Sequence, residues 1–235
     1  MVTGRPEYSG SFLDKIVEGL LVLLPPAALL GPWAGSGRVF GYRILVVLLV
    51  GCAVTGWIYP IWVRRFSRAA CAIVVVAVAW AVTGVVGAMR LGPRRDLSSL
   101  MGAGLALAGA WSVARLISDR HIRRERALRD VAIGWAVAVW AGAPLAVWEI
   151  LTARHLGTYA DGAWRNHPGL YRQPATWLTN PNLYAVFLAV GSVWVGVVGV
   201  RSATRWVRIA AIATAVTGLG LLLATDSRIV YAALL

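Results

Sequence analysis

Residues 152–186 read TARHLGTYADGAWRNHPGLYRQPATWLTNPNLYAV, and they form the one long polar interval in a chain of otherwise apolar segments. The interval holds two of the three histidines, His155 and His167, and its Asn180-Pro181-Asn182 motif directly precedes the next apolar segment. A second polar cluster, Thr225-Asp226-Ser227-Arg228, follows one predicted helical hairpin later. If the protein has a functional site, we expect it between these two clusters.

The composition around this interval is that of a membrane protein. Of the 235 residues, 59% are hydrophobic and only 14% are charged, and the mean hydropathy is +0.69. Soluble domains carry about a quarter of charged residues. Apolar runs of roughly 17 or more residues, separated by short basic links, predict helices that cross a membrane. The predicted fold class is therefore all-α, a polytopic transmembrane helix bundle.

We expect residues 1–235 to form a single integral membrane domain with seven full spans and the start of an eighth. The predicted spans are residues 15–31, 39–63, 69–89, 97–117, 131–151, 183–200 and 207–225, followed by a short apolar run at 228–235. Pro25 and Pro26 are expected to kink or break the first span. Because the last run is too short to cross the hydrocarbon core, we expect the chain to be truncated, the N-terminal part of a larger bundle.

Charge sets the expected orientation. The formal net charge is +13, and all but one of the cations are arginine. With the N-terminus in the cytoplasm, the inner segments carry more lysine and arginine than the outer ones, as membrane proteins prefer. This places residues 152–182 in an extracytoplasmic loop, with Arg228 on the same side. Arginine in the links suits contact with membrane lipids, and no soluble basic domain indicates nucleic-acid binding.

The sequence offers no signal for a metal or a cofactor. Cys52 and Cys71 lie in or near apolar segments, and no cysteine or histidine spacing typical of a metal site occurs. We also expect no acid or histidine at the membrane centre, where ion-coupled transporters carry their coupling groups.

Arg172 lies in the segment GLYRQPATWLTNPN (169–182), which is too apolar for a free loop. We expect this segment to be a re-entrant or surface piece at the membrane interface. The guanidinium of Arg172 can then either contact lipid head groups or bind a diphosphate through two parallel hydrogen bonds. Arg228 has two similar interpretations, since Asp226 can neutralise it or it can serve a ligand.

The remaining polar residues have structural explanations beside functional ones. Asn180 is suited to capping a helix, and Pro181 to its first turn. His155 and His167 are weak candidates for general bases, because two histidines in so long a loop are also expected to be exposed and without a role.

Together, R-x7-N-P-N (from Arg172) and T-x-S-R (from Thr225) resemble motifs of the O-antigen ligase and polymerase superfamily. Members of that family are polytopic glycosyltransferases of the bacterial cytoplasmic membrane that assemble surface polysaccharides. The resemblance implies a glycan donor on a polyprenyl diphosphate, no metal and no cofactor, with Arg172 and Arg228 as the diphosphate binders. Two positions depart from the family, where Ala175 or a neighbour and Ile229 stand in place of glycines.

The resemblance also implies where the acceptor-activating histidine belongs. In the family it lies in a later extracytoplasmic loop, which here would follow residue 235. We therefore expect the chain alone to be inactive in transfer. Two alternatives remain open, a membrane transporter of a small solute and an inactive truncated remnant.

Overall fold

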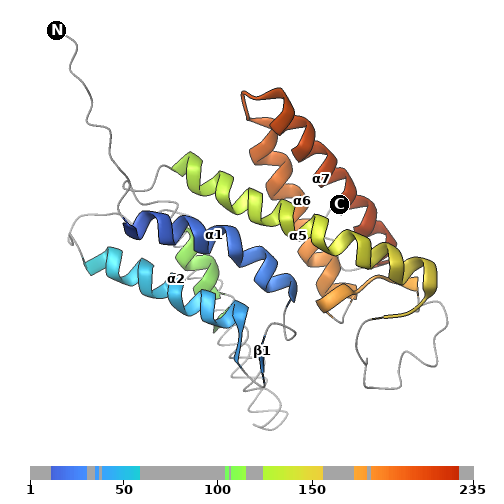
Figure 1. Ribbon diagram of the computed structural model, residues 1–235, viewed down its shortest axis with the longest axis horizontal. Coiled ribbons are helices and arrows are strands. Elements are labelled where there is room, and N and C mark those ends of the chain that lie inside the picture. Colours follow the sequence, from blue (N-terminus) through green and yellow to red (C-terminus); the bar gives the residue numbers. More distant parts are fainter. Residues whose placement is uncertain are drawn as a thin grey trace.

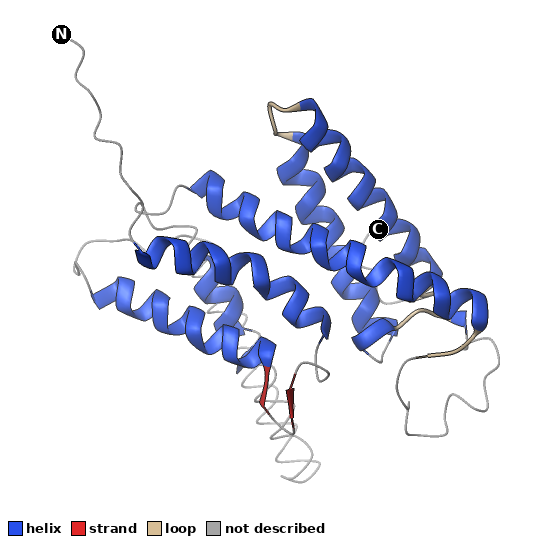
Figure 2. Ribbon diagram, viewed as in Figure 1, coloured by secondary structure: helices blue, strands red, loops and turns tan. Residues whose placement is uncertain are grey.

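The computed structural model describes residues 12–30, 35–36, 39–58, 104–105, 107–114, 124–155, 172–178 and 181–227. In chain order its elements are α1 (Phe12–Leu30), β1 (Gly35–Ser36), β2 (Val39–Phe40), α2 (Gly41–Ile58), α5 (Arg124–Thr152), the 3₁₀ turn η3 (Thr176–Leu178), α6 (Pro181–Val200) and α7 (Arg205–Ala224). Residues 104–105 and 107–114 are also helical. In the described part of the chain, strands are confined to the short antiparallel ladder β1–β2 that precedes α2 (Figure 2). The all-α prediction is confirmed.

Helix α5 is the element against which the others pack. The antiparallel hairpin of α6 and α7 covers one side of α5, α1 lies along another, and α2 packs on α1 (Figure 1). Small residues permit the close approach within the hairpin, since a Cβ added to Gly199 would collide with Ala211 and one added to Gly218 with Ser192. Such contacts are typical of helices that pack inside a membrane.

Three helices of the described residues are long and apolar enough to cross a membrane: Glu125–Thr152, Pro181–Val200 and Arg205–Ala224. Large apolar side chains are exposed along α6 at helical spacing, which is expected for a face turned toward lipid. They are Leu183, Val186, Val190, Val193 and Val197. The chain is a membrane protein on these grounds.

The other predicted spans either form helices that are less apolar or shorter than a full span, or lie outside the described residues. Helix α1 carries Asp14, Lys15 and Glu18, and the apolar part of α2, Gly41–Val54, is shorter than a full span. The spans expected at residues 69–89 and 228–235, and most of that at 97–117, lie outside the described residues.

Pro25 and Pro26, expected to kink or break the first span, do not break it: α1 runs as one helix through both prolines. Pro26 has no N–H, so the carbonyl of Val22 loses its partner within the helix. That carbonyl packs against Gly134 of α5, at a point where any Cβ would collide with it. The interruption in the hydrogen bonds of α1 thus becomes a close contact between two helices.

Four of the described helices, α1, α5, α6 and α7, begin two or more residues earlier than the apolar pattern predicts. Helix α5 starts at Arg124, within the charged link before residue 131, and α6 starts at Pro181. Helical hydrogen bonding continues into polar sequence as long as the side chains can reach water or a partner. Here Arg126 reaches Glu18 of α1, with 3.2 Å between Nη1 and Oε1.

A buried apolar cluster joins α1, α5, α6 and α7. Leu29 of α1, Val139 of α5, Tyr184 and Leu188 of α6 and Leu222 of α7 belong to it. Phe187 is another member, and its ring contacts that of Trp135, which packs against the cluster, with centroids 4.6 Å apart. Close packing of this kind fixes the helix ends that lie next to it.

Candidate functional site at the polar end of the bundle

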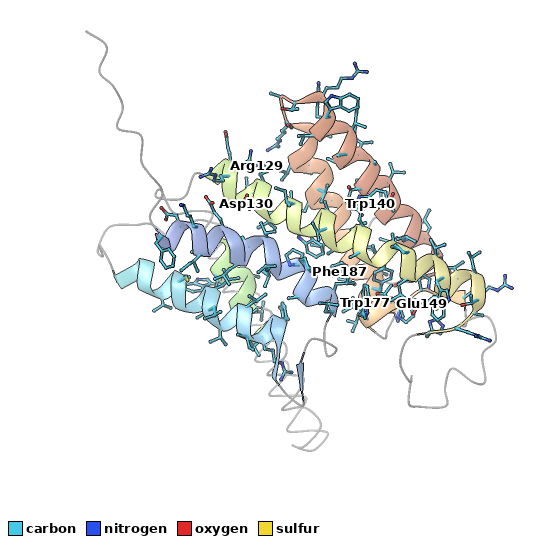
Figure 3. The ribbon with its side chains drawn as sticks, viewed as in Figure 1. Arg129, Asp130, Trp140, Glu149, Trp177 and Phe187 are labelled. Carbon is cyan, nitrogen blue, oxygen red and sulfur yellow. The ribbon has the colours of Figure 1, made fainter. Side chains whose placement is uncertain are left out.

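One end of the α5–α6–α7 bundle collects the polar sequence. The C-terminus of α5, η3, the N-terminus of α6 and the C-terminus of α7 meet there. We call this the polar end and define it as residues 149–155, 172–178, 181–182 and 225–227. Figure 3 shows Glu149 and Trp177 at this end, with Arg129 and Asp130 at the opposite end of α5.

The two motif clusters are in direct contact at the polar end. Ser227 Oγ donates a hydrogen bond to Asn182 Oδ1 across 2.9 Å. Ser227 is buried, whereas Asn182, in the first turn of α6, is exposed. Two segments that lie 45 positions apart in the sequence are therefore held together by motif residues.

The second cluster forms the C-terminal end of α7 and the turn that follows it. Thr225 caps the helix, and its Oγ1 donates to the carbonyl of Leu222 at 2.6 Å. Asp226 then takes a positive φ of 50°, which turns the chain away from the helix axis. Arg228, the residue predicted to bind a diphosphate, lies outside the described residues.

Glu149 is the most deeply placed polar group of the polar end. Its side chain is fully buried, and Oε2 accepts hydrogen bonds from the backbone N–H groups of Ala175 and Thr176, each at 2.8 Å. Its other oxygen, Oε1, is 3.3 Å from Nδ1 of His155, whose side chain is only 10% exposed. Successive N–H groups that converge on one oxygen form an anion-binding concavity, here filled by the chain's own carboxyl group.

The polar end also holds unusual backbone conformations. Among the described residues, the non-glycine residues with positive φ are Ala153 (54°), Thr176 (51°) and Asp226 (50°), and all three lie there. Such a residue costs about 1–3 kcal/mol and persists only where its surroundings enforce it, which is common at functional sites. Thr176 is the most unfavourable of them, because its side chain is β-branched.

Arg172 opens the described segment 172–178, and its side chain is exposed. Pro174, Ala175 and Thr176 are buried, and Trp177 packs against the apolar cluster between α5 and α6. The segment thus rests on the helix bundle by its second half and presents Arg172 to the outside. Whether this segment is the re-entrant or surface piece expected at the membrane interface stays a prediction.

Of the other predicted site residues, Pro181 is the first residue of α6, as its chemistry suggests. Asn180 and His167 lie outside the described residues, so the predicted cap and the role of that histidine are not tested. His155 is brought next to Glu149 rather than left exposed. The described residues include no group of three or more histidine, cysteine or acidic side chains that could hold a metal ion.

Sequence reasoning missed Glu149. No acid lies near the middle of a predicted span, whereas Glu149 lies near the end of the predicted span 131–151. An acid inside an apolar span is itself a signal of function or of a specific partner. Its partners could not be identified, because the N–H groups that it accepts lie 26 and 27 positions further along the chain.

The fold and the polar end define a helical membrane protein with a polar site at one end of its bundle. Comparison of the chain with protein-family models found no match. Comparison with curated proteins and with solved structures found none either.

Proposed function

We propose that the protein is a membrane glycosyltransferase of bacterial surface polysaccharide assembly, which transfers or polymerises glycan from a polyprenyl diphosphate. One observation carries the proposal, the hydrogen bond between Ser227 and Asn182. The resemblance to the O-antigen ligase and polymerase superfamily rests on two short motifs, and this bond joins them in space. Two motifs that serve one ligand need such proximity.

In this proposal Arg172 and Arg228 bind the diphosphate of the donor. A guanidinium group matches phosphate oxygens with two parallel hydrogen bonds, and it stabilises the negative charge that builds up as the diphosphate leaves. Arg172 is exposed at the polar end, and Arg228 directly follows the buried Ser227. The proposal therefore requires Arg228 to lie close enough to Arg172 for both guanidinium groups to reach one diphosphate.

The same proposal gives the chain an orientation. The polar end faces the extracytoplasmic side, and the N-terminus lies in the cytoplasm of a bacterial cell. Five arginines at the opposite end of the bundle support this, because cationic residues favour the cytoplasmic side. They are Arg126, Arg129, Arg201, Arg205 and Arg208. We retain the seven spans and the start of an eighth as part of the proposal.

Binding of the donor tests the proposal directly. The protein in lipid nanodiscs is titrated with a polyprenyl diphosphate and, separately, with the corresponding monophosphate. Loss of a hydrogen-bonded charge typically costs about 1.5–3 kcal/mol, so Arg172→Ala should weaken diphosphate binding roughly tenfold or more. Arg172→Lys should restore little, because lysine lacks the planar pair of donors.

The matched control is Arg154→Ala, which removes another exposed arginine of the polar end. It should leave the diphosphate affinity within about twofold of wild type, since a surface charge alone contributes little. Equal losses in Arg154→Ala and Arg172→Ala would show non-specific attraction to the basic surface. Equal affinity for the monophosphate and the diphosphate would likewise contradict a diphosphate site.

Glu149 favours transport of a small solute as a second candidate function. A buried acid paired with a histidine near the end of a span is the kind of group that couples proton movement to transport. Proteoliposomes loaded with a pH-sensitive dye distinguish the two functions. Proton flux that depends on a solute and is lost in Glu149→Gln supports the transporter, whereas specific diphosphate binding without flux supports the transferase.

A further inference from the structure

We infer that Glu149 is a positioning residue for Arg172: its buried carboxyl group holds residues 172–178 in one conformation and so fixes the place from which the arginine reaches its ligand. We call this segment the Arg172 turn. The consequence for diphosphate binding rests on the proposed function. The hydrogen bonds by which Glu149 holds the Arg172 turn, which we call the clamp, do not depend on the proposed function.

Glu149 accepts hydrogen bonds from the backbone N–H groups of Ala175 and Thr176. Both N–H groups point to the same oxygen, Oε2, and all the atoms involved are buried. A buried N–H group without a partner is expensive, and so is a buried carboxyl group. The carboxyl group and the two N–H groups therefore compensate for each other's burial. If the Arg172 turn moved away from α5, these groups would lose their hydrogen-bond partners unless water replaced them.

Thr176 has a backbone conformation that needs support from outside the residue. A β-branched residue at a φ of 51° is unfavourable by itself, so an external contact must hold it. The N–H of Thr176 is one of the two groups that Glu149 accepts. If that contact is lost, Thr176 can relax to a negative φ, and the relaxation redirects the chain on both sides of it. Arg172 is four positions away and would move with it.

The carboxyl group of Glu149 is itself supported by the elements around it. Glu149 lies in the last turn of α5, and Tyr184 and Leu188 of α6 are buried in the apolar cluster beside it. His155 approaches the second oxygen, Oε1, from the chain that follows α5. The carboxyl group is thus carried by a helix that is packed in place, as a group that fixes another segment must be.

Hydrogen–deuterium exchange of the protein without ligand tests the clamp. In Glu149→Ala the amides of Ala175 and Thr176 should exchange about tenfold faster or more, because bonds to an acidic group are lost. Glu149→Gln should keep most of the protection, since a single amide oxygen can accept both N–H groups. Glu125→Ala, which removes an exposed acid from the other end of α5, is the control and should change neither amide.

A spin label reports on the position of Arg172 itself. The label is attached to the cysteine of Arg172→Cys, in a protein whose Cys52 and Cys71 are replaced by alanine. Its motion should be restricted when residue 149 is the native glutamate and in Glu149→Gln, and it should be mobile in Glu149→Ala. If Glu149→Ala loses protection throughout α6 and α7 as well, the residue is needed for the whole fold and the inference is overturned. Unchanged protection at Ala175 and Thr176 in Glu149→Ala overturns it too.

Titration with polyprenyl diphosphate separates this inference from the proposed function. Weaker binding in Glu149→Ala with recovery in Glu149→Gln supports positioning. Wild-type affinity in Glu149→Ala, despite a mobile label, overturns positioning but leaves the diphosphate site intact. Failure of the wild-type protein to bind the diphosphate removes the proposed function, while exchange and label mobility still decide whether Glu149 clamps the turn.

Discussion

The two ends of helix α5 carry acid–base pairs of nearly the same length in different surroundings. At the end near Arg124, Arg126 lies 3.2 Å from Glu18, with side chains that are 54% and 26% exposed. At the polar end, His155 lies 3.3 Å from Glu149, with side chains that are 10% and 0% exposed. Distance alone would rank these pairs as equals.

Burial makes them different. An exposed ion pair competes with water at both partners and contributes about 0–1 kcal/mol. A buried acidic group cannot hydrogen-bond to water if its partners are lost, so those partners must be in place for the burial to be tolerated. The pair at the Arg124 end joins two helices that already pack together, whereas Glu149 also accepts the buried N–H groups of Ala175 and Thr176.

Charge reversal at the two acids should give the largest contrast. Glu149→Lys places an amine against two buried N–H donors, and we expect a loss of about 3–5 kcal/mol in the free energy of unfolding. Glu18→Lys should change it by about 1 kcal/mol or less. Thermal unfolding in detergent and the yield of monodisperse protein measure both. Similar losses for the two variants would mean that burial does not distinguish the pairs.

The hydrogen bond between the motifs should have an intermediate effect. A double-mutant cycle with Ser227→Ala and Asn182→Ala should give a coupling energy of about 1 kcal/mol. The comparison is the bond from Trp140 Nε1 to Thr214 Oγ1, also 2.9 Å, in the middle of α5 and α7. A cycle with Trp140→Phe and Thr214→Val should give about 0.6 kcal/mol, typical of bonds between membrane helices. Coupling near zero for Ser227 and Asn182 would show that the contact between the motifs carries no energy.

The smallest effect should come from relieving backbone strain. Ala153 follows α5 with a φ of 54°, where glycine avoids the clash of a Cβ, so Ala153→Gly should stabilise the fold by about 0.5–1 kcal/mol. Ala141→Gly, at an exposed position inside α5, should destabilise it by a similar amount, about 0.5–1 kcal/mol. Equilibrium unfolding of the two variants should therefore shift in opposite directions. A shift of the same sign in both would argue against strain at Ala153.

Much of the fold could be predicted from local sequence. The predicted spans 183–200 and 207–225 differ by at most two residues at either end from α6 and α7. Hydropathy suffices here because a helix in lipid must satisfy all its backbone groups internally and present apolar side chains. The fate of Pro25 and Pro26 was not predictable in this way, since it depends on a glycine more than a hundred positions later, Gly134 of α5.

In the candidate site, too, some features follow from local sequence and others depend on distant contacts. The sequence by itself determined the membrane class, the two polar clusters, and Pro181 as the start of a helix, because each follows from the chemistry of neighbouring residues. Only the tertiary structure decided that Ser227 bonds to Asn182, and that Glu149 accepts the N–H groups of Ala175 and Thr176. These contacts join segments 26 to 45 positions apart, and the packing of α5, α6 and α7 brings them together. A polar residue near the end of an apolar span acquires its role from what that packing places beside it.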